Sequence, residues 1–180
     1  MLLWCSTKIK LSPLLFVIFI NDLVKHISQD CRVFLYADDL KVVKNIRNVN
    51  NCFILQQNVD SVLEWCNKNH LCMNKDKCRV MSFSRKNENL SYDYTMNGVS
   101  LIRCQQFKDL GVIMDSTLSF IPHINYVTNK ATRMLGFVVR NTREFQSIEC
   151  ILLLYYSFVR SVLEYCSIIW NPYYNIIQSV

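Results

Sequence analysis

The spacing of hydrophobic residues along the first half of the chain predicts its helices and strands. Residues 50–69 carry apolar side chains at steps of three and four, which predicts an amphipathic helix. Residues 33–37 and 40–44 are short apolar runs and predict two strands, the first apolar on both faces and therefore expected to be central. Residues 13–28 begin with proline and are apolar almost all around, which predicts a buried helix.

Short strands are expected again beyond residue 77. Residues 78–83 and residues 107–115 each predict one strand, and residues 92–102 predict a hairpin. Asn97 and Gly98 lie at the centre of this hairpin, and this residue pair favours a type I′ turn because both positions require a positive φ.

The last third of the chain changes to a helical pattern. An apolar face with helical spacing follows Pro122, and a second one runs from Ile148 to Cys166, where Asn171 and Pro172 are expected to end the helix. The order predicts an α+β fold, with an antiparallel sheet backed by helices over residues 1–118 and a helical region over residues 119–180.

Charge and hydropathy narrow the choice of partner. The 180 residues carry a formal net charge of +6, with Lys and Arg scattered along the chain. This favours an anionic partner such as nucleic acid, although an ordinary basic surface explains it equally well. The apolar run 11–20 stops at Asn21 and Asp22 after ~10 residues, where a membrane span needs ~20, so we expect no membrane association.

Cysteine usage points to an intracellular, reducing compartment, cytoplasm or nucleus. The chain has nine cysteines, an odd number, and none are spaced as CxxC, so neither a zinc site nor a disulfide framework is indicated. Cys66, His70 and Cys72 form the nearest approach to a metal cluster, and it is a weak one. Cys52 and Cys66 fall on the apolar face of one predicted helix and Cys166 on that of another, as small core residues do.

Asp38 and Asp39 are the residue pair most informative about chemistry. They separate two predicted apolar strands, so their carboxylates are expected at the tip of a hairpin, outside the hydrophobic layer. Carboxylates are the ligands that Mg²⁺ prefers, and two such ions serve in nucleotidyl transfer. Asp is also an ordinary turn residue, so the pair by itself leaves both interpretations open.

A series of short motifs in fixed order narrows that choice. It comprises Leu11–Phe16 (LSPLLF), Phe19–Leu23 (FINDL), Tyr36–Asp39 (YADD), Trp65, Asn69–Asn74 (NHLCMN), Lys77, Asp109–Val112 (DLGV), Asp115, Leu118, His123–Ile124, Val159–Cys166 (VRSVLEYC) and Trp170–Pro172 (WNP). In this order the chain resembles the reverse transcriptases of non-LTR (LINE-like, jockey-type) retrotransposons from about Leu11 to Pro172. The resemblance implies a palm followed by a thumb.

The resemblance also implies roles for the YADD segment and its surroundings. Asp38 would be the principal Mg²⁺ ligand and Asp39 its partner, while Tyr36 and Ala37 would lie beside the primer terminus or the incoming nucleotide. Lys77 would protonate the leaving pyrophosphate or steady the triphosphate, although a solvated basic segment explains Lys77 equally well. The parent enzyme would use two Mg²⁺ ions, deoxynucleoside triphosphates, an RNA template and a DNA primer.

The same resemblance implies that two further segments contact nucleic acid. Leu110 and Gly111 lie in a stretch similar to the primer grip, where the glycine would allow close approach of the primer. Lys130, Arg133 and Arg140 lie near one edge of the helix after Pro122 and could contact duplex phosphates, or could form a solvated face.

Departures from the family pattern concern the start of the chain. The family has Gly-x-Pro-Gln-Gly-Ser before Leu-Ser-Pro, whereas residues 4–10 read WCSTKIK. The strand with the first catalytic aspartate should lie further upstream, and Asp22 and Asp30 are poor substitutes for it. We therefore expect an inactive fragment of the polymerase. The alternatives are a noncatalytic nucleic-acid-binding module and an unrelated basic domain.

Overall fold

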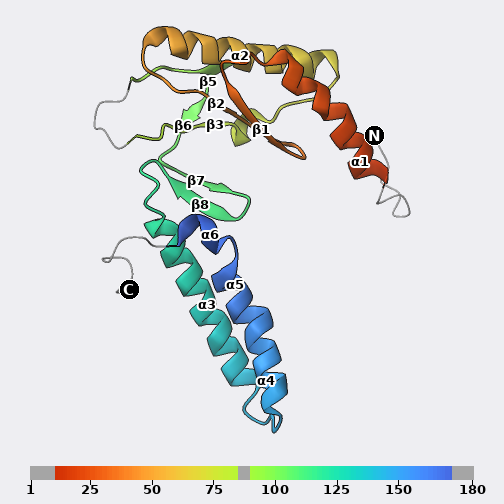
Figure 1. Cartoon of the computed structure of the whole chain (residues 1–180), viewed down its shortest axis with the longest axis vertical. Coiled ribbons are helices and arrows are strands. Elements are labelled where there is room, and N and C mark those ends of the chain that lie inside the picture. The colour runs from red at the N-terminus through yellow and green to blue at the C-terminus, as the bar shows by residue number, and fades with distance from the viewer. Residues whose placement is uncertain (1–10, 85–89, 172–180) are drawn as a thin grey trace. The chain divides into compact units, whose positions relative to one another are not determined.

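The computed structural model describes residues 11–84 and 90–171 and divides into two compact units (Figure 1). Met1–Val80 and Glu88–Arg103 form unit 1, and Met81–Asn87 and Cys104–Val180 form unit 2. This division by contacts does not test the palm-to-thumb boundary expected near residue 118, which stays a prediction.

Unit 1 begins with helix α1 (Leu11–Ile20), which gives way to the 3₁₀ helix η1 (Asn21–His26). The expected α-helix to residue 28 is therefore too long. In η1 the carboxylate of Asp22 lies 3.1 Å from the Lys25 ammonium, an i,i+3 pair that the three-residue turn of a 3₁₀ helix aligns. The expectation that this segment is buried is also wrong for much of α1, because Leu15 and Ile18 are more than half exposed.

Strands β1 (Arg32–Tyr36) and β2 (Asp39–Val43) form the predicted antiparallel hairpin. Val33, Leu35, Leu40 and Val42 pack against the hydrophobic core, whereas Phe34, on the other face of β1, is exposed. Among the described residues β1 pairs only with β2, so the prediction of a central strand is wrong. The prediction assumed that apolar residues on both faces of β1 would be covered, but those on its outer face, such as Phe34, are exposed.

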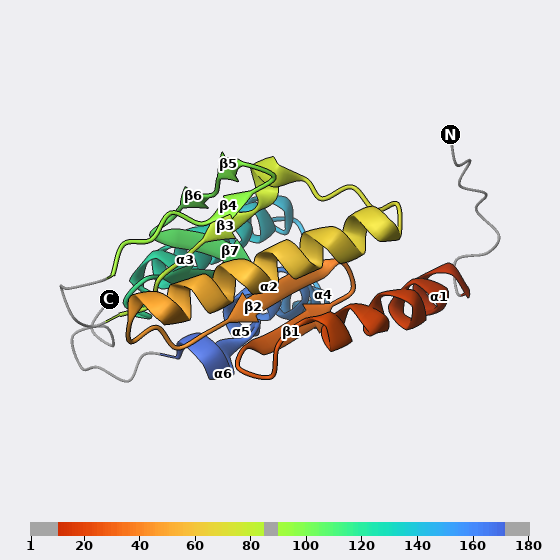
Figure 2. The same cartoon turned by 90° about the horizontal axis from the view of Figure 1, so that it is seen from above.

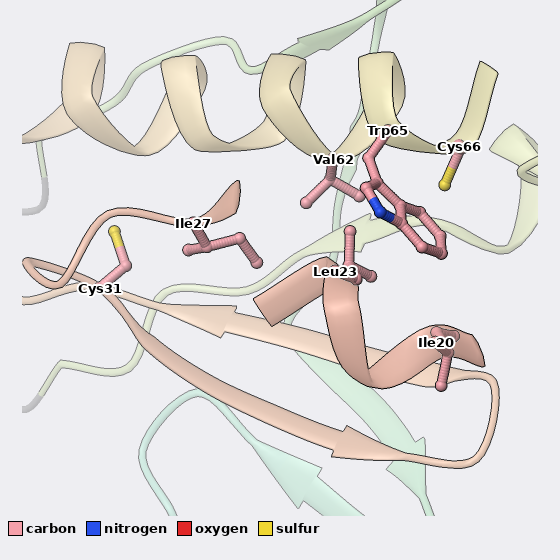
Figure 3. Packing of buried hydrophobic residues seen from close by; sticks show 7 residues of the cluster. All are labelled: Ile20, Leu23, Ile27, Cys31, Val62, Trp65 and Cys66. Atoms are coloured by element: carbon pink, nitrogen blue, oxygen red, sulfur yellow. The ribbon is translucent and has the colours of Figure 1, made fainter. Parts of the chain in front are cut away.

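Helix α2 (Val49–Lys68) lies over this hairpin (Figures 1 and 2) and supplies much of the unit 1 core. Asn48 and Asn51 begin the helix with a reciprocal capping box, which satisfies backbone N–H groups that have no partner within the helix. Figure 3 shows Val62 and Trp65 of α2 directed toward Leu23 of η1. These contacts hold η1, α2 and the inner face of the hairpin in one core.

Two very short sheets complete unit 1. The pair β4 (Thr95–Met96) and β5 (Val99–Ser100) is antiparallel, and Asn97 and Gly98 have φ values of 50° and 73°, which confirms the predicted hairpin. The expected strand 78–83 shrinks to β3 (Arg79–Val80), which pairs in parallel with β6 (Ile102–Arg103). The sheets of the described chain are thus separate pairs, and not all are antiparallel.

Unit 2 starts with a hairpin where the sequence pattern predicted one strand. Strands β7 (Gln106–Asp109) and β8 (Val112–Asp115) are antiparallel and are joined by Leu110 and Gly111. Both residues have positive φ, 44° and 92°, which reverses the chain in two residues. The prediction of a single strand is wrong because the apolar pattern continues across this turn.

Helix α3 (Ile121–Asn141) packs beside a second helical segment. This segment consists of α4 (Ile148–Tyr155), the π-helix η3 (Tyr156–Arg160), α5 (Ser161–Glu164) and α6 (Ser167–Trp170). The expected uninterrupted helix is wrong because α5 ends at Glu164, and Cys166, with a φ of 52°, precedes the separate helix α6. Ala131, Val138 and Val159 form the core between the two helical segments.

The described elements are helices and small, mostly antiparallel sheets, which is an α+β composition. No helix in residues 11–84 or 90–171 has both the length and the apolar character needed to cross a membrane.

Candidate functional site

Asp38 and Asp39 lie at the tip of the β1–β2 hairpin. Tyr36 and Asp39 are paired across the two strands, so the turn consists of Ala37 and Asp38 alone. Ala37 has a φ of 52°, which is uncommon for a residue with a side chain. The tight turn places one carboxylate in the reversal itself and the other on the first residue of β2.

Both carboxylates are available to a cation. Asp38 and Asp39 are exposed, and neither side chain has a hydrogen-bond or ion-pair partner in the part of the chain that the structure describes. Their oxygen atoms are the donors that Mg²⁺ prefers. Within that part of the chain no third His, Cys, Asp or Glu joins them in a group that could hold a metal ion. The pair therefore fits a partial Mg²⁺ site.

Asp22 and Asp30, the other acidic residues considered, lie outside the hairpin turn. The Asp22 carboxylate bonds to Lys25, and this interaction holds its pKa below the ordinary value. Asp30 accepts a hydrogen bond at its backbone oxygen from the Lys44 ammonium, at 3.2 Å.

Lys77 lies in the short 3₁₀ helix η2 (Lys75–Lys77) of unit 1 and is exposed. The Asn74 side chain caps this turn by accepting a hydrogen bond from the Asp76 backbone N–H at 3.0 Å. No described contact joins Lys77 to Asp38 or Asp39. The structure thus leaves the proposed role of Lys77 in pyrophosphate departure untested.

Leu110 and Gly111 contact Tyr165, a residue near the end of the chain. The Tyr165 hydroxyl donates a hydrogen bond to the Leu110 carbonyl oxygen at 2.7 Å. A Cβ atom on Gly111 would lie only 3.0 Å from Cε1 of the Tyr165 ring. The requirement for glycine here has two causes within the chain itself, a φ of 92° and this close ring.

The basic residues of α3 have no acidic residue on the same helix. Residues 121–141 contain no Asp or Glu, and no described carboxylate pairs with Lys130, Arg133 or Arg140. Arg133 and Arg140 are exposed and Lys130 is half-buried. The cations therefore remain free to attract an anion.

Lys108 and Tyr126 extend this basic surface, and the sequence analysis did not find them. The Lys108 ammonium donates a hydrogen bond to the Tyr126 hydroxyl at 3.3 Å and lies 4.7 Å from the centre of the ring. The pKa of Tyr126 is lowered first by this hydrogen bond and further by the charges of Lys108, Lys130 and Arg133. The cations of β7 and α3 thus act together on one phenol.

The described cysteines form no metal site. Cys66 is buried whereas Cys72 is exposed, and neither belongs to a metal-holding group with His70. Burial raises the pKa of the Cys66 thiol and also that of the Cys78 thiol. Cys52 and Cys66 are buried, as predicted from their helix face, and Cys166 is half-buried.

Comparison with known proteins identifies the family of this chain. Residues 9–139 match the family described as reverse transcriptase (RNA-dependent DNA polymerase), which is more than half of the chain. The chain belongs to the reverse transcriptase family. The matched part includes Asp38, Asp39, Gly111 and Lys130, whereas Arg140 lies one residue beyond it.

Two curated relatives are RNA-directed DNA polymerases from the mobile element jockey. The relative from Drosophila melanogaster is 25% identical over 166 residues, which cover 86% of this chain and 18% of the relative. The relative from Drosophila funebris is 31% identical over 121 residues, which cover 63% of this chain and 13% of the relative. The chain therefore spans less than a fifth of each relative, and the resemblance to non-LTR retrotransposon reverse transcriptases is confirmed. No solved structure matches the chain significantly.

Asp115 has a structural role in this reverse transcriptase chain that its motif position did not reveal. Its carboxylate is buried and accepts hydrogen bonds from backbone N–H groups of Ser119 (3.1 Å) and Phe120 (2.9 Å) and from the Thr117 hydroxyl. Burial acts to raise the pKa of Asp115, but these hydrogen bonds outweigh it, so the pKa lies below its ordinary value. Asp115 thus organises the loop that leads into α3.

His123 of this reverse transcriptase chain links α3 to the β7–β8 hairpin. Its side chain is 1% exposed, and Nδ1 accepts a hydrogen bond from the Ile113 backbone N–H at 3.2 Å. Burial, and then the charge of Lys108, lowers the pKa of His123, so the ring is neutral at pH 7. Nε2 is buried without a described hydrogen-bond partner, and the ring packs against Trp170 at a centroid distance of 5.3 Å.

Proposed function

We propose that this chain supplies the Asp-Asp hairpin and part of the primer–template surface of the RNA-directed DNA polymerase of a non-LTR retrotransposon. One observation carries the proposal: two exposed, unpaired aspartates occupy the tip of an antiparallel hairpin inside the segment that matches the reverse transcriptase family. The substrates of such a polymerase would be an RNA template, a DNA primer and deoxynucleoside triphosphates.

Asp38 and Asp39 would hold Mg²⁺ in this polymerase. When bound, two such ions activate the primer 3′-hydroxyl and stabilise the leaving pyrophosphate. Because neither carboxylate has a partner among the described residues, metal binding there would break none of the ion pairs that the structure describes. Tyr36 and Ala37, next to the pair, would lie beside the primer terminus or the incoming nucleotide, and Lys77 would act on the triphosphate.

Unit 2 would contact the primer–template duplex through backbone phosphates. Lys130, Arg133 and Arg140 have no acidic neighbour on α3, and Lys108 and Tyr126 add a cation and a hydroxyl donor to the same surface. Contacts of this kind bind nucleic acid of any sequence and weaken with salt. Residues 1–118 would then form the palm part and residues 119–180 the thumb, with Leu110 and Gly111 at the primer.

Catalysis would need a carboxylate from a further strand. In the described chain no third metal-ligating residue joins Asp38 and Asp39, and in the family the first catalytic aspartate belongs to a strand upstream of them. A polypeptide of these 180 residues alone is therefore expected not to extend a primer.

Primer extension on an RNA template with Mg²⁺ tests this proposal. The 180-residue chain is compared with a longer polymerase that adds the aspartate-bearing strand and the Gly-x-Pro-Gln-Gly-Ser loop. We expect extension only by the longer polymerase, with complete loss in Asp38→Ala and partial loss in Lys77→Ala, because a general acid contributes ~10²- to 10⁴-fold. Extension that survives Asp38→Ala would disprove the assignment of the metal ligand.

A second candidate function is noncatalytic binding of nucleic acid. The observation that favours it is that α3 carries basic residues and no Asp or Glu. Binding of phosphates by these residues would need no metal ion. Primer extension separates the two functions. A noncatalytic binding module would bind the duplex both as the 180-residue chain and as the longer polymerase, but neither protein would extend the primer.

A further inference from the structure

The turn of the β7–β8 hairpin is fixed by one aromatic residue from the C-terminal helices. Tyr165 donates its hydroxyl hydrogen to the Leu110 carbonyl oxygen at 2.7 Å, and its ring occupies the space beside Gly111. Tyr165 thus contacts both residues of the turn. Its side chain also remains 52% exposed, so the contact lies at the surface of unit 2.

Trp170 contacts the backbone of Tyr165, whereas the turn contacts its side chain. The indole Nε1 of Trp170 donates a hydrogen bond to the Tyr165 carbonyl oxygen at 2.8 Å. This hydrogen bond spans the break between α5 and α6, where Cys166 has a φ of 52°. The turn, Tyr165 and Trp170 therefore form one continuous set of contacts.

The same set of contacts returns to the hairpin through His123. The Trp170 ring meets the His123 ring edge-on, at an angle of 71°, and His123 accepts a hydrogen bond from Ile113 of β8. The hairpin is thereby held at two points, at its turn by Tyr165 and along β8 by His123. Two separate attachments restrain a hairpin more strongly than one, because a single contact would leave it free to rotate.

We propose that Tyr165 and Trp170 are positioning residues that hold the Leu110–Gly111 turn in the conformation that receives the primer–template duplex. This inference rests on the proposed function, in which the turn lies at the primer. Leu110 is 44% exposed and has a φ of 44°, a conformation that is costly for a residue with a side chain, so the hydrogen bond from Tyr165 helps to hold the turn in it. Because Tyr165 is 52% exposed, its proposed role is to orient a surface turn that contacts nucleic acid and not to stabilise the core.

The chain offers a direct spectroscopic readout of this turn, because it contains only three glycines. Labelling with ¹⁵N-glycine gives three amide resonances, from Gly98, Gly111 and Gly136, which Gly98→Asn and Gly136→Ala assign. In Tyr165→Phe the Gly111 resonance should shift while the other two stay in place. Tyr156→Phe is the matched control, since Tyr156 is 48% exposed in the same helical segment and its hydroxyl has no described partner.

Duplex binding provides the second readout on the same proteins. A fluorescein-labelled DNA primer annealed to an RNA template is titrated with the 180-residue chain, and the Gly111 resonance is followed on addition of the unlabelled duplex. The duplex should shift the Gly111 resonance of the wild-type chain. Tyr165→Phe should bind about 2- to 10-fold more weakly, the range expected for one hydrogen bond. Trp170→Phe should weaken binding in the same direction, and Tyr156→Phe should not.

The outcomes separate this inference from the proposed function. A Gly111 resonance that does not move in Tyr165→Phe overturns the inference. If the duplex shifts Gly111 but Tyr165→Phe binds like the wild type, the turn is at the nucleic acid and Tyr165 does not position it. If the duplex never shifts Gly111, the proposed place of the turn at the primer is wrong, and the positioning role is overturned with it.

Discussion

Tyr36 and Asp39 face each other across the last pair of the β1–β2 hairpin, so Ala37 and Asp38 make the whole turn. This register has a direct consequence for the aspartates. Asp39 is anchored by strand pairing, whereas Asp38 lies in the reversal, and both side chains remain exposed.

Replacing the aspartates should remove cation binding without loss of stability. Asp38→Asn and Asp39→Asn each eliminate one exposed, unpaired carboxylate, so the free energy of unfolding should change by less than about 0.5 kcal/mol. Mn²⁺, used in place of Mg²⁺ and followed by electron paramagnetic resonance, should bind more weakly to each variant and least to the double variant. Asp93→Asn, an exposed aspartate of the same unit, is the control. Equal Mn²⁺ binding in all variants would contradict the site.

Ala37 should report the strain in the turn. Alanine already bears the roughly 1–2 kcal/mol cost of a Cβ atom in the left-handed region, and a β-branched side chain is disfavoured there further, so Ala37→Val should destabilise the chain by about 1 kcal/mol. Ala37→Asn should stay close to the wild type, because Asn tolerates this conformation. Ala37→Gly should be neutral or stabilising by less than about 1 kcal/mol, since the gain is offset by the greater entropy of unfolded glycine. Urea denaturation measures all three, and a Val variant as stable as the Asn variant would argue against the positive φ.

Asp115 should make the stability of the chain depend on acid pH. Its pKa is lowered in the folded chain below the ordinary 3.8, so its contribution is complete above pH 3.8 and is lost as the pH falls through the folded value. Asp115→Asn should cost about 1–3 kcal/mol at pH 7, because buried backbone N–H groups lose charged partners. Denaturation of both proteins between pH 7 and pH 3 should give curves that converge at low pH. A constant difference would contradict the lowered pKa.

Duplex binding should depend on salt through the cations of α3. Each phosphate contact releases counterions, so the slope of log affinity against log salt should fall by up to about 0.9 for each cation removed. Lys130, Arg133 and Arg140 replaced together by alanine should therefore reduce the slope clearly, and adding Lys108→Ala should reduce it further. Replacing Arg47, Lys68 and Arg143 removes the same charge elsewhere and is the control. Equal slopes for the two triple variants would show that net charge alone attracts the duplex.

Much of the candidate site could be predicted from the sequence because its elements are local. The hairpin around Asp38 and the turn at Asn97 and Gly98 depend on residues that are neighbours in the chain, and the helix over residues 49–68 depends on a repeat within its own length. The order of short motifs likewise pointed to the reverse transcriptase family, which the comparisons confirm.

Tertiary structure alone decided which of these residues meet. The turn at Leu110 was hidden because the apolar pattern runs across it, and the hydroxyl that fixes it comes from a residue 55 positions further along the chain. The break at Cys166 and the burial of His123 follow from the same contacts. Local periodicity shows which face of an element is apolar, but it cannot show which distant side chain will cover it. The exposed faces of α1 and β1 were misjudged for that reason, because burial depends on neighbours that are brought near only when the chain folds.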